Sequence, residues 1–422
     1  MDSSNPERDP LLGTINDADI DISKPFTPSK DKESSYGNIS TFSVVVNCII
    51  GTGVFALPYA TFSAGVPLTL ITFSICSLFI LVAAVWVLEI LARTEGYVKG
   101  TSRGRMDRAA NEITFKKYDF TSLSEVFAKL AGKISTQIVM TVYCLGCLWA
   151  YVAVFASTLS MVIFKFFVKD GTQCDVYAPG GLVLCGFATL FTSSAVALNV
   201  HYNLPDAIQP MRQKRYARGV TLSAMLLSLV FFVAIGITCA LTFGSNTKGL
   251  VTLNWESYTG LDGGWGKGEP QWWATVLQLV IVLFPMFNML SIFPLIATTV
   301  GSNVEQFLPK RWIEARPRTV SVLCRWGNTI LPVVLTVFVG RLEVIFQFTG
   351  LFAYVLELII PCIYQWLSTR KTYPEHQTPY SGWYSRNWLV LVVLIFGLGA
   401  FGFAFAEEIY SLVVPAPTSN WA

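Results

Sequence analysis

The sequence has little charge and very little histidine. Its 422 residues include only 14% Asp, Glu, Lys and Arg, a net charge of +3 and two histidines. Without a long basic run, this composition excludes nucleic acid as an expected partner. The nine cysteines lie mostly in or beside apolar runs, and their spacing matches neither a disulfide framework nor a metal site. We therefore predict no cofactor, no metal and no enzymatic activity.

Apolar sequence is abundant instead. Hydrophobic residues make up 53% of the chain, and its mean hydropathy is +0.52, far above that of a soluble domain. Apolar runs of about 20 residues predict transmembrane helices. The sequence therefore predicts an all-α polytopic membrane protein with about nine spans. These are Thr41–Phe62, Pro67–Leu91, Ile134–Phe167, Gly180–Val200, Val220–Phe243, Trp272–Val300, Val320–Val339, Leu342–Tyr364 and Trp388–Tyr410.

The distribution of Lys and Arg predicts the orientation of these spans. With the N-terminus in the cytosol, 25 of the 30 basic residues fall in segments that face inward. Cytosolic loops are enriched in basic residues in this way. Adding or removing one span would invert the bias downstream of it, so the charge pattern favours nine spans with the C-terminus outside.

Three regions follow from this topology. Residues 1–40 are polar and rich in Ser and Pro, which predicts a disordered cytosolic tail. Residues 41–412 form the transmembrane domain, and 413–422 form a short lumenal or extracellular tail. In the N-terminal tail, Glu7 precedes Leu11 and Leu12 in the spacing of an acidic dileucine signal. This signal is read by clathrin adaptors, and it favours a lysosomal, endosomal or vacuolar membrane over the plasma membrane.

A short amphipathic helix is predicted on the cytosolic side, between the second and third spans. Ser122-Leu123-Ser124-Glu125 matches a capping box. Apolar residues follow at helical spacing, so we expect this helix to lie at the membrane surface.

The first span contains its own interruption. Gly51, Thr52 and Gly53 lie near its middle, and Pro58 follows shortly after. Glycine weakens a helix and an interior proline removes a backbone hydrogen bond. Breaks of this kind line the binding sites of many secondary transporters. A plain kink, or glycine used for close helix packing, explains the same residues.

A second interruption ends the fourth span. Asn199-Val200-His201-Tyr202-Asn203-Leu204-Pro205 introduces polar residues and a proline after an apolar run. Two broken helices at matching positions of two halves point to an inverted-repeat transporter.

The motifs at these breaks resemble a known family. The pattern N-x-x-x-G-T-G-V-x-A-L-P-x-A, which begins at Asn47, resembles the first helix of the amino acid/auxin permease family. This family includes sodium-coupled neutral amino acid transporters and vacuolar amino acid permeases. HYNLP, LFPMFNMLSIFPLIATTV and Phe348-Thr349-Gly350 resemble its sixth, eighth and tenth helices.

The resemblance implies a LeuT/APC-like inverted-repeat fold that holds a substrate amino acid between the broken first and sixth helices. It places the substrate carboxylate on Gly51, Thr52 and Gly53, with other candidate substrate-binding residues nearby. These are Asn47, Tyr151, His201 and Asn203. In sodium-coupled members Asn47 would match a cation ligand, but Leu283 stands where its hydroxyl partner is expected. The resemblance therefore favours a proton over sodium as the coupling ion.

The chain also departs from the family pattern. The family has eleven helices, and here residues 168–179 stand in place of its fourth and fifth. The chain is then either a shortened form or a reduced relative that no longer transports. The two hypotheses are an amino acid transporter and a non-transporting sensor or scaffold.

Ionisable residues inside the spans are candidate sites, because they are costly in a membrane. Glu357 is the deepest acid, and it is either a proton carrier or a paired structural residue. His201 at the second break is a further proton-coupling candidate. Glu89 lies about a turn from the end of its span, where we expect its side chain to reach the interface.

Overall fold

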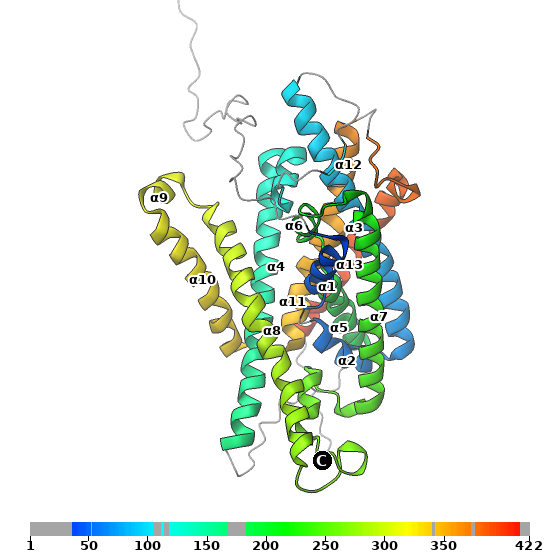
Figure 1. Cartoon of the computed structure of the whole chain (residues 1–422), viewed down its shortest axis with the longest axis vertical. Helices are drawn as coiled ribbons and strands as arrows, with labels where there is room; N and C mark the ends of the chain where they lie inside the picture. Colours follow the sequence, from blue (N-terminus) through cyan, green and yellow to red (C-terminus); the bar gives the residue numbers. More distant parts are fainter. Residues whose placement is uncertain are drawn as a thin grey trace, which may run out of the picture.

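The fold is built from helices (Figure 1). The computed structural model describes residues 36–51, 53–103, 111–113, 118–167, 183–339, 342–372 and 376–413. No strand forms among these residues, although an isolated parallel bridge joins Tyr36 to Met211. This bridge ties the start of the first helix to the segment that follows the second predicted break. The all-α class predicted from composition is confirmed.

The helices follow the predicted spans in order. They are α1 Asn38–Ile49, α2 Gly53–Ala64, α3 Val66–Arg103, α4 Phe120–Phe167, α5 Val183–Leu198, α6 Leu204–Ile208, α7 Ala217–Phe243, α8 Trp272–Glu305, α9 Lys310–Ala315, α10 Pro317–Phe338, α11 Leu342–Tyr354, α12 Ile360–Lys371 and α13 Asn387–Val413. A π-helical turn, Val355–Ile359, joins α11 to α12. Short 3-10 turns lie between α7 and α8 and before α13.

Each predicted span has a helical counterpart. Seven helices among the described residues are long and apolar enough to cross a membrane, and α1 with α2 makes an eighth, bent by 53°. The counterpart of the remaining span is α5, which has 16 described residues and is therefore shorter than a typical span. The structure describes neither 1–35 nor 414–422, so most of both predicted tails and the dileucine signal lie outside the described residues. The same holds for the replaced segment 168–179. Residues 38–40, which were predicted to belong to the N-terminal tail, form the start of α1.

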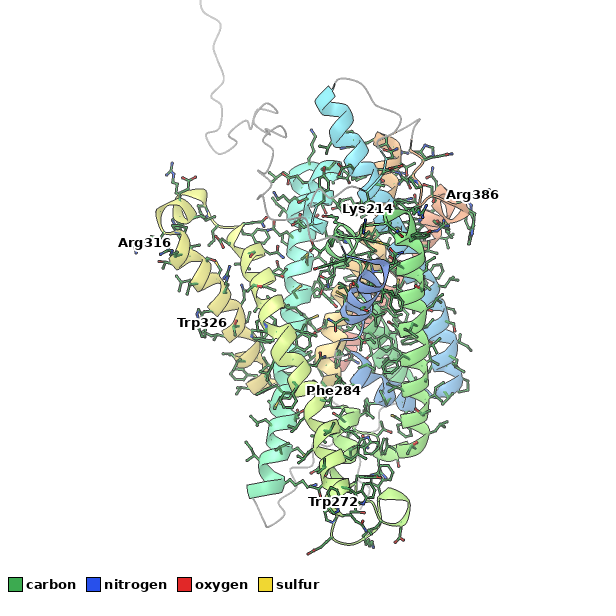
Figure 2. The ribbon with its side chains drawn as sticks, in the orientation of Figure 1. Lys214, Trp272, Phe284, Arg316, Trp326 and Arg386 are labelled. Atoms are coloured by element: carbon green, nitrogen blue, oxygen red, sulfur yellow. The ribbon has the colours of Figure 1, made fainter. Side chains whose placement is uncertain are left out.

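The basic segments gather at one end of the bundle. Figure 2 shows Lys214, Arg316 and Arg386 toward that end and Trp272 at the opposite end. The connections at the basic end are those that the charge pattern assigned to a single side of the membrane.

Small residues allow the central helices to approach closely. A Cβ atom added to Gly53 in α2 would lie 2.8 Å from the Cα atom of Ala197 in α5. One added to Gly350 in α11 would lie 2.6 Å from the Cβ atom of Thr192, also in α5. Glycine at such crossings is typical of membrane helix packing, where backbone proximity replaces the hydrophobic driving force. The broken helix α1–α2 is thereby held against the centre of the bundle.

The amphipathic helix before the third span forms, but its start differs from the prediction. Asp119, rather than Ser122, caps the helix, since its carboxylate accepts the Ser122 N–H at 3.1 Å. The helix begins at Phe120, and a kink at Lys129 (φ 56°, ψ −154°) separates this first part from the long remainder of α4. Asp119 directly precedes the first helical residue, and its carboxylate accepts an N–H of the first turn, as an N-cap residue does. The capping box predicted at Ser122 therefore does not mark the start of the helix.

The prediction that Glu89 reaches the interface is wrong. Its side chain is fully buried and pairs with Arg93 one turn along α3, at 2.6 Å. Gln365 of α12 donates to Glu89 at 2.9 Å and accepts from Arg93 at 2.7 Å. Ser381 and Ser385, which precede α13, also donate to Glu89. Glu89 and Arg93 can both be buried because each of them has several hydrogen-bond partners. These hydrogen bonds join α3, α12 and the connection to α13.

Candidate transport site

The first break is a tight turn between α1 and α2. Ile50 has φ −76° and ψ 79°, which is close to an inverse γ-turn. Its neighbour Gly51 donates its N–H to the Ile49 carbonyl at 2.8 Å. Thr52 lies outside the described residues. The N–H of Gly51 therefore already has a hydrogen-bond acceptor. The N–H groups that have no acceptor within a helix are those in the first turn of α2.

A mostly apolar pocket with a few polar side chains opens beside this break. Its volume is about 350 Å³, which falls in the range of small-ligand sites. It is lined by α1, the break, the start of α2 and the middle of α8. The lining residues are Phe42, Ser43, Val46, Asn47, Ile50, Gly51, Phe55, Phe284 and Asn288. Apolar walls with a few convergent amide and hydroxyl groups are suited to a small polar ligand.

The two glycines of the break face different surroundings. A Cβ atom at Gly51 would contact only the Tyr151 hydroxyl, at 3.8 Å, whereas one at Gly53 would meet backbone atoms of Ala197. Gly51 therefore leaves its side of the break open toward the pocket and Tyr151. Gly53 has a packing role, which is one of the alternatives that the sequence left open.

Tyr151 lies beside the first break. It lies in α4 and is 6% exposed, and its hydroxyl would lie 3.8 Å from a Cβ atom at Gly51. The Tyr202 ring lies against Tyr143 of α4, with centroids 5.6 Å apart in an edge-to-face arrangement. Helix α4 thus presents Tyr151 to the first break and Tyr143 to the second.

The second break forms between α5 and α6 as predicted. His201 is fully buried, and its Nε2 atom lies 3.1 Å from the Ile80 carbonyl of α3. Neither its Nδ1 atom nor the side-chain amide of Asn199 has a hydrogen-bond partner among the described residues. Asn203 precedes α6, which begins at Leu204. His201 and Asn203 do not line the described pocket, and their role in binding stays a prediction.

Glu357 lies in the π-helical turn between α11 and α12. Its side chain is fully buried, and neither carboxylate oxygen has a hydrogen-bond partner among the described residues. The adjacent Leu358 packs tightly on α13, since a Cβ atom at Gly397 would lie 2.9 Å from its Cβ atom. A π-helical turn often marks a functional position in a helix. No residue in the described part of the chain hydrogen-bonds to the Glu357 carboxylate, so the alternative of a paired structural residue has no support there.

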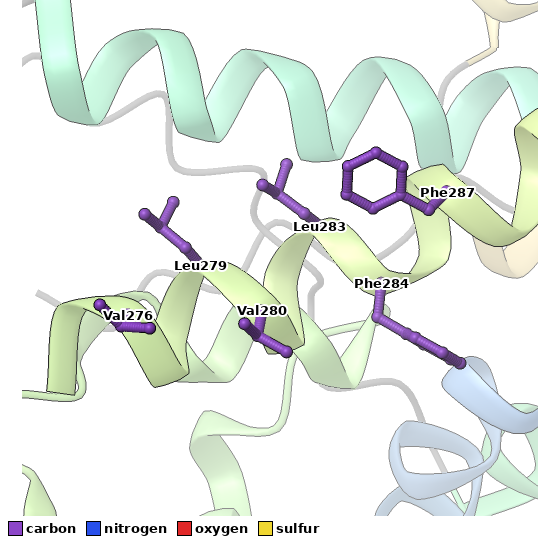
Figure 3. Close-up of a pocket in the computed structure, with 6 residues that line it drawn as sticks. All are labelled: Val276, Leu279, Val280, Leu283, Phe284 and Phe287. Atoms are coloured by element: carbon purple, nitrogen blue, oxygen red, sulfur yellow. The ribbon is translucent and has the colours of Figure 1, made fainter. Parts of the chain in front are cut away.

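Leu283 lies in an apolar hollow. This second pocket, of about 310 Å³, is lined by Val276, Leu279, Val280, Leu283, Phe284 and Phe287 of α8. Figure 3 shows Leu279, Leu283 and Phe287 on the side of α8 turned toward α4. Phe284 instead points toward α2, where its ring meets Phe55 edge to face at 6.2 Å. A hollow without oxygen ligands is unsuited to sodium.

Two polar residues of the pocket were not identified from the sequence. Ser43 lies one turn before Asn47 in α1, and Asn288 projects from α8. A polar residue in an apolar helix is a usable signal, and Asn288 lies inside the motif that resembles the eighth helix. The signal gives no partner, however, and only the packing of α8 beside α1 brings the two asparagines to one pocket.

Comparison with known proteins gives the family. The family described as "Transmembrane amino acid transporter protein" matches residues 177–409, more than half of the chain. The chain belongs to this family. The match covers the second break, α8 and the π-helical turn that carries Glu357.

The names of the proteins similar to this chain do not state a function. Transmembrane protein 104 of Gallus gallus is 25% identical over 244 residues, which cover 55% of this chain and 46% of the relative. Its homolog in Caenorhabditis elegans is 22% identical over 341 residues, covering 61% of this chain and 66% of the relative. The chain therefore spans about half to two thirds of the length of these relatives.

Proposed function

We propose that this protein is a secondary active transporter of amino acids, coupled to protons and located in a lysosomal, endosomal or vacuolar membrane. Family membership supports amino acid transport in general. The pocket at the break between α1 and α2 is the observation that carries the proposal for this chain. It combines an interrupted helix, open space at Gly51 and amide and hydroxyl side chains in a mostly apolar wall.

The substrate carboxylate is assigned to the first turn of α2. That turn carries a partial positive charge and N–H groups without helical acceptors. Its Phe55 lines the pocket, together with Asn47 and Asn288. The two side-chain amides would bind the polar groups of the amino acid, and the Tyr151 hydroxyl lies beside Gly51.

Glu357 is assigned as the proton carrier. A fully buried carboxyl group without a described partner is suited to gain and lose a proton during a transport cycle. His201, also fully buried, is the second candidate. The apolar surroundings of Leu283 favour the proton over sodium.

A non-transporting sensor or scaffold is the second proposed function. One observation favours it: Ser43 and Asn47 line the pocket but are exposed on the surface of the described protein. A transport site must be closed to lipid on all sides, because polar groups are costly there. A pocket that stays open can still bind a ligand without moving it.

Uptake into proteoliposomes tests transport. Labelled amino acids are supplied with and without an inward proton gradient. We expect gradient-dependent uptake that Asn47→Ala and Asn288→Ala reduce at least about tenfold, because each loses a polar contact to the substrate. Thr238→Ala, at an exposed position on α7, is the matched control and should keep full uptake. Absence of uptake for every amino acid by folded protein contradicts transport.

Thermal stabilisation separates the two functions. An amino acid that raises the melting temperature of the wild type, but not of Asn47→Ala, without any uptake supports the sensor.

The location is tested in cells. Replacing Glu7, Leu11 and Leu12 by alanine should move the protein toward the plasma membrane and remove its capture by clathrin adaptors. Unchanged sorting excludes this signal.

A further inference from the structure

The corner where α9 meets α10 is unusually rich in exposed arginine. Between residues 310 and 325 the chain has five basic residues and one acid. The four arginines of this α9–α10 corner, Arg311, Arg316, Arg318 and Arg325, are all exposed. In Figure 1 this corner forms the outer edge of the bundle, beside the end of α8. An exposed cluster of positive charge attracts anions.

The described protein supplies no such anion. None of the four guanidinium groups forms a hydrogen bond or an ion pair with any described residue. Other basic residues at this end are engaged: Lys214 donates to the Met211 carbonyl at 3.1 Å, and Arg218 donates to the Tyr384 hydroxyl at 2.9 Å. The first turn of α10 also has no acidic residue, so the positive end of the helix adds to the arginine charge.

The position of Arg325 points to the membrane surface. It lies eight residues after Pro317, the first residue of α10, which is about 12 Å along the helix axis. Its stem rests on α8, since a Cβ atom at Gly301 would lie 2.6 Å from its Cγ atom. Arg318 precedes it by two helical turns on the same face. Two guanidinium groups therefore lie in one stripe, at the depth where arginine extends toward lipid phosphates.

Aromatic and apolar side chains are exposed beside this stripe. Trp312 is 63% exposed and Trp326 is 64% exposed, and Figure 2 shows Trp326 on the outward side of α10. Tryptophan prefers the level of the lipid headgroups. Further along α10, large apolar side chains are exposed: Ile330, Leu331, Val333, Val334, Val337 and Phe338. A ligand that matches the whole surface needs an anionic head and an apolar chain.

We propose that the α9–α10 corner binds the headgroup of an anionic phospholipid. Arg318 and Arg325 hydrogen-bond the phosphate, Trp312 and Trp326 flank the headgroup, and an acyl chain lies along the apolar face of α10. Arginine suits this role because its planar guanidinium group can donate two parallel hydrogen bonds to one phosphate. A free phosphate, or an acidic peptide in the cytosol, would leave the apolar part of the surface unmatched.

Lipid retention tests the proposal independently of transport. The full chain is placed in nanodiscs of phosphatidylcholine with phosphatidylglycerol, extracted gently and analysed by native mass spectrometry. We expect the wild type to retain phosphatidylglycerol. Arg318→Gln with Arg325→Gln should lower its retention about thirtyfold beyond the loss in a control pair, because each arginine also loses its hydrogen bonds to the phosphate, about fivefold each. The matched control is Arg212→Gln with Arg386→Gln, which removes two exposed charges at the same end.

Three outcomes overturn the proposal. They are unchanged retention in Arg318→Gln/Arg325→Gln, an equal loss in the control, and displacement of the lipid by glycerol phosphate alone. The second result would mean a general attraction to the basic end, and the third a site for small anions. Arg318→Lys with Arg325→Lys keeps the positive charges but removes the planar guanidinium groups. This variant should retain an amount of phosphatidylglycerol between those of the wild type and the glutamine variant. Equal melting temperatures in pure phosphatidylcholine discs show that the variants are folded.

Discussion

Replacing Gly53 by alanine tests the close contact between the broken helix and the centre of the bundle. The new Cβ atom would lie 2.8 Å from the Cα atom of Ala197 and 3.0 Å from its N and Cβ atoms. Carbon atoms prefer separations of about 3.5–4.0 Å. Helix α2 must therefore move by about 0.7–1.2 Å away from α5, or both helices must distort.

The expected loss of stability in Gly53→Ala results from overpacking. Forcing an extra methyl group into a packed interior costs about 1–3 kcal/mol. Alanine is a better helix former than glycine by at most about 1 kcal/mol, and less at the first residue of a helix. We therefore expect Gly53→Ala to lower the free energy of unfolding by about 1–2 kcal/mol, seen as a melting temperature a few degrees lower.

Gly51→Ala is the matched control. Its Cβ atom would make only an ordinary contact with the Tyr151 hydroxyl, at 3.8 Å, so stability should stay within about 0.5 kcal/mol. Amino acid binding should weaken instead, because the methyl group enters the pocket.

A double variant sharpens the test. Ala197→Gly should not rescue Gly53→Ala, since the backbone Cα and N atoms of residue 197 remain in the way. Equal melting temperatures for the two glycine variants, or rescue by Ala197→Gly, would refute the reasoning. Melting is measured on detergent-purified protein by tryptophan fluorescence.

Three further variants follow from the same packing and from the buried charges. Glu89→Ala leaves Arg93 buried without its carboxylate, so we expect a loss of about 3–5 kcal/mol in the same melting assay; a change below about 1 kcal/mol would show that the network is dispensable. Gly350→Ala places a Cβ atom 2.6 Å from the Cβ atom of Thr192, and it should destabilise the protein about as much as Gly53→Ala. Glu357→Gln should keep the fold but abolish the dependence of uptake on the proton gradient, whereas persistent gradient dependence would assign coupling to another residue.

The sequence was sufficient for features that depend on local composition. Each predicted span has a helix because a run of about 20 apolar residues is itself the condition for crossing a membrane. Both breaks were predicted because glycine, proline and polar residues interrupt a helix wherever they stand. The gathering of basic segments at one end follows from the order and length of the spans. The motifs at the breaks also predicted the family that comparison shows.

Contacts between distant segments were decided only by the tertiary structure. Gly51 and Gly53 look equivalent in the sequence, yet one faces a pocket and the other meets Ala197. Glu89 is buried because Gln365 and the connection to α13 reach it across the bundle. Composition and periodicity state which residues prefer a helix or an apolar environment, but not which helices become neighbours. Which helices become neighbours depends on close packing among many side chains at once. This packing brings Asn47 of α1 and Asn288 of α8 to one pocket.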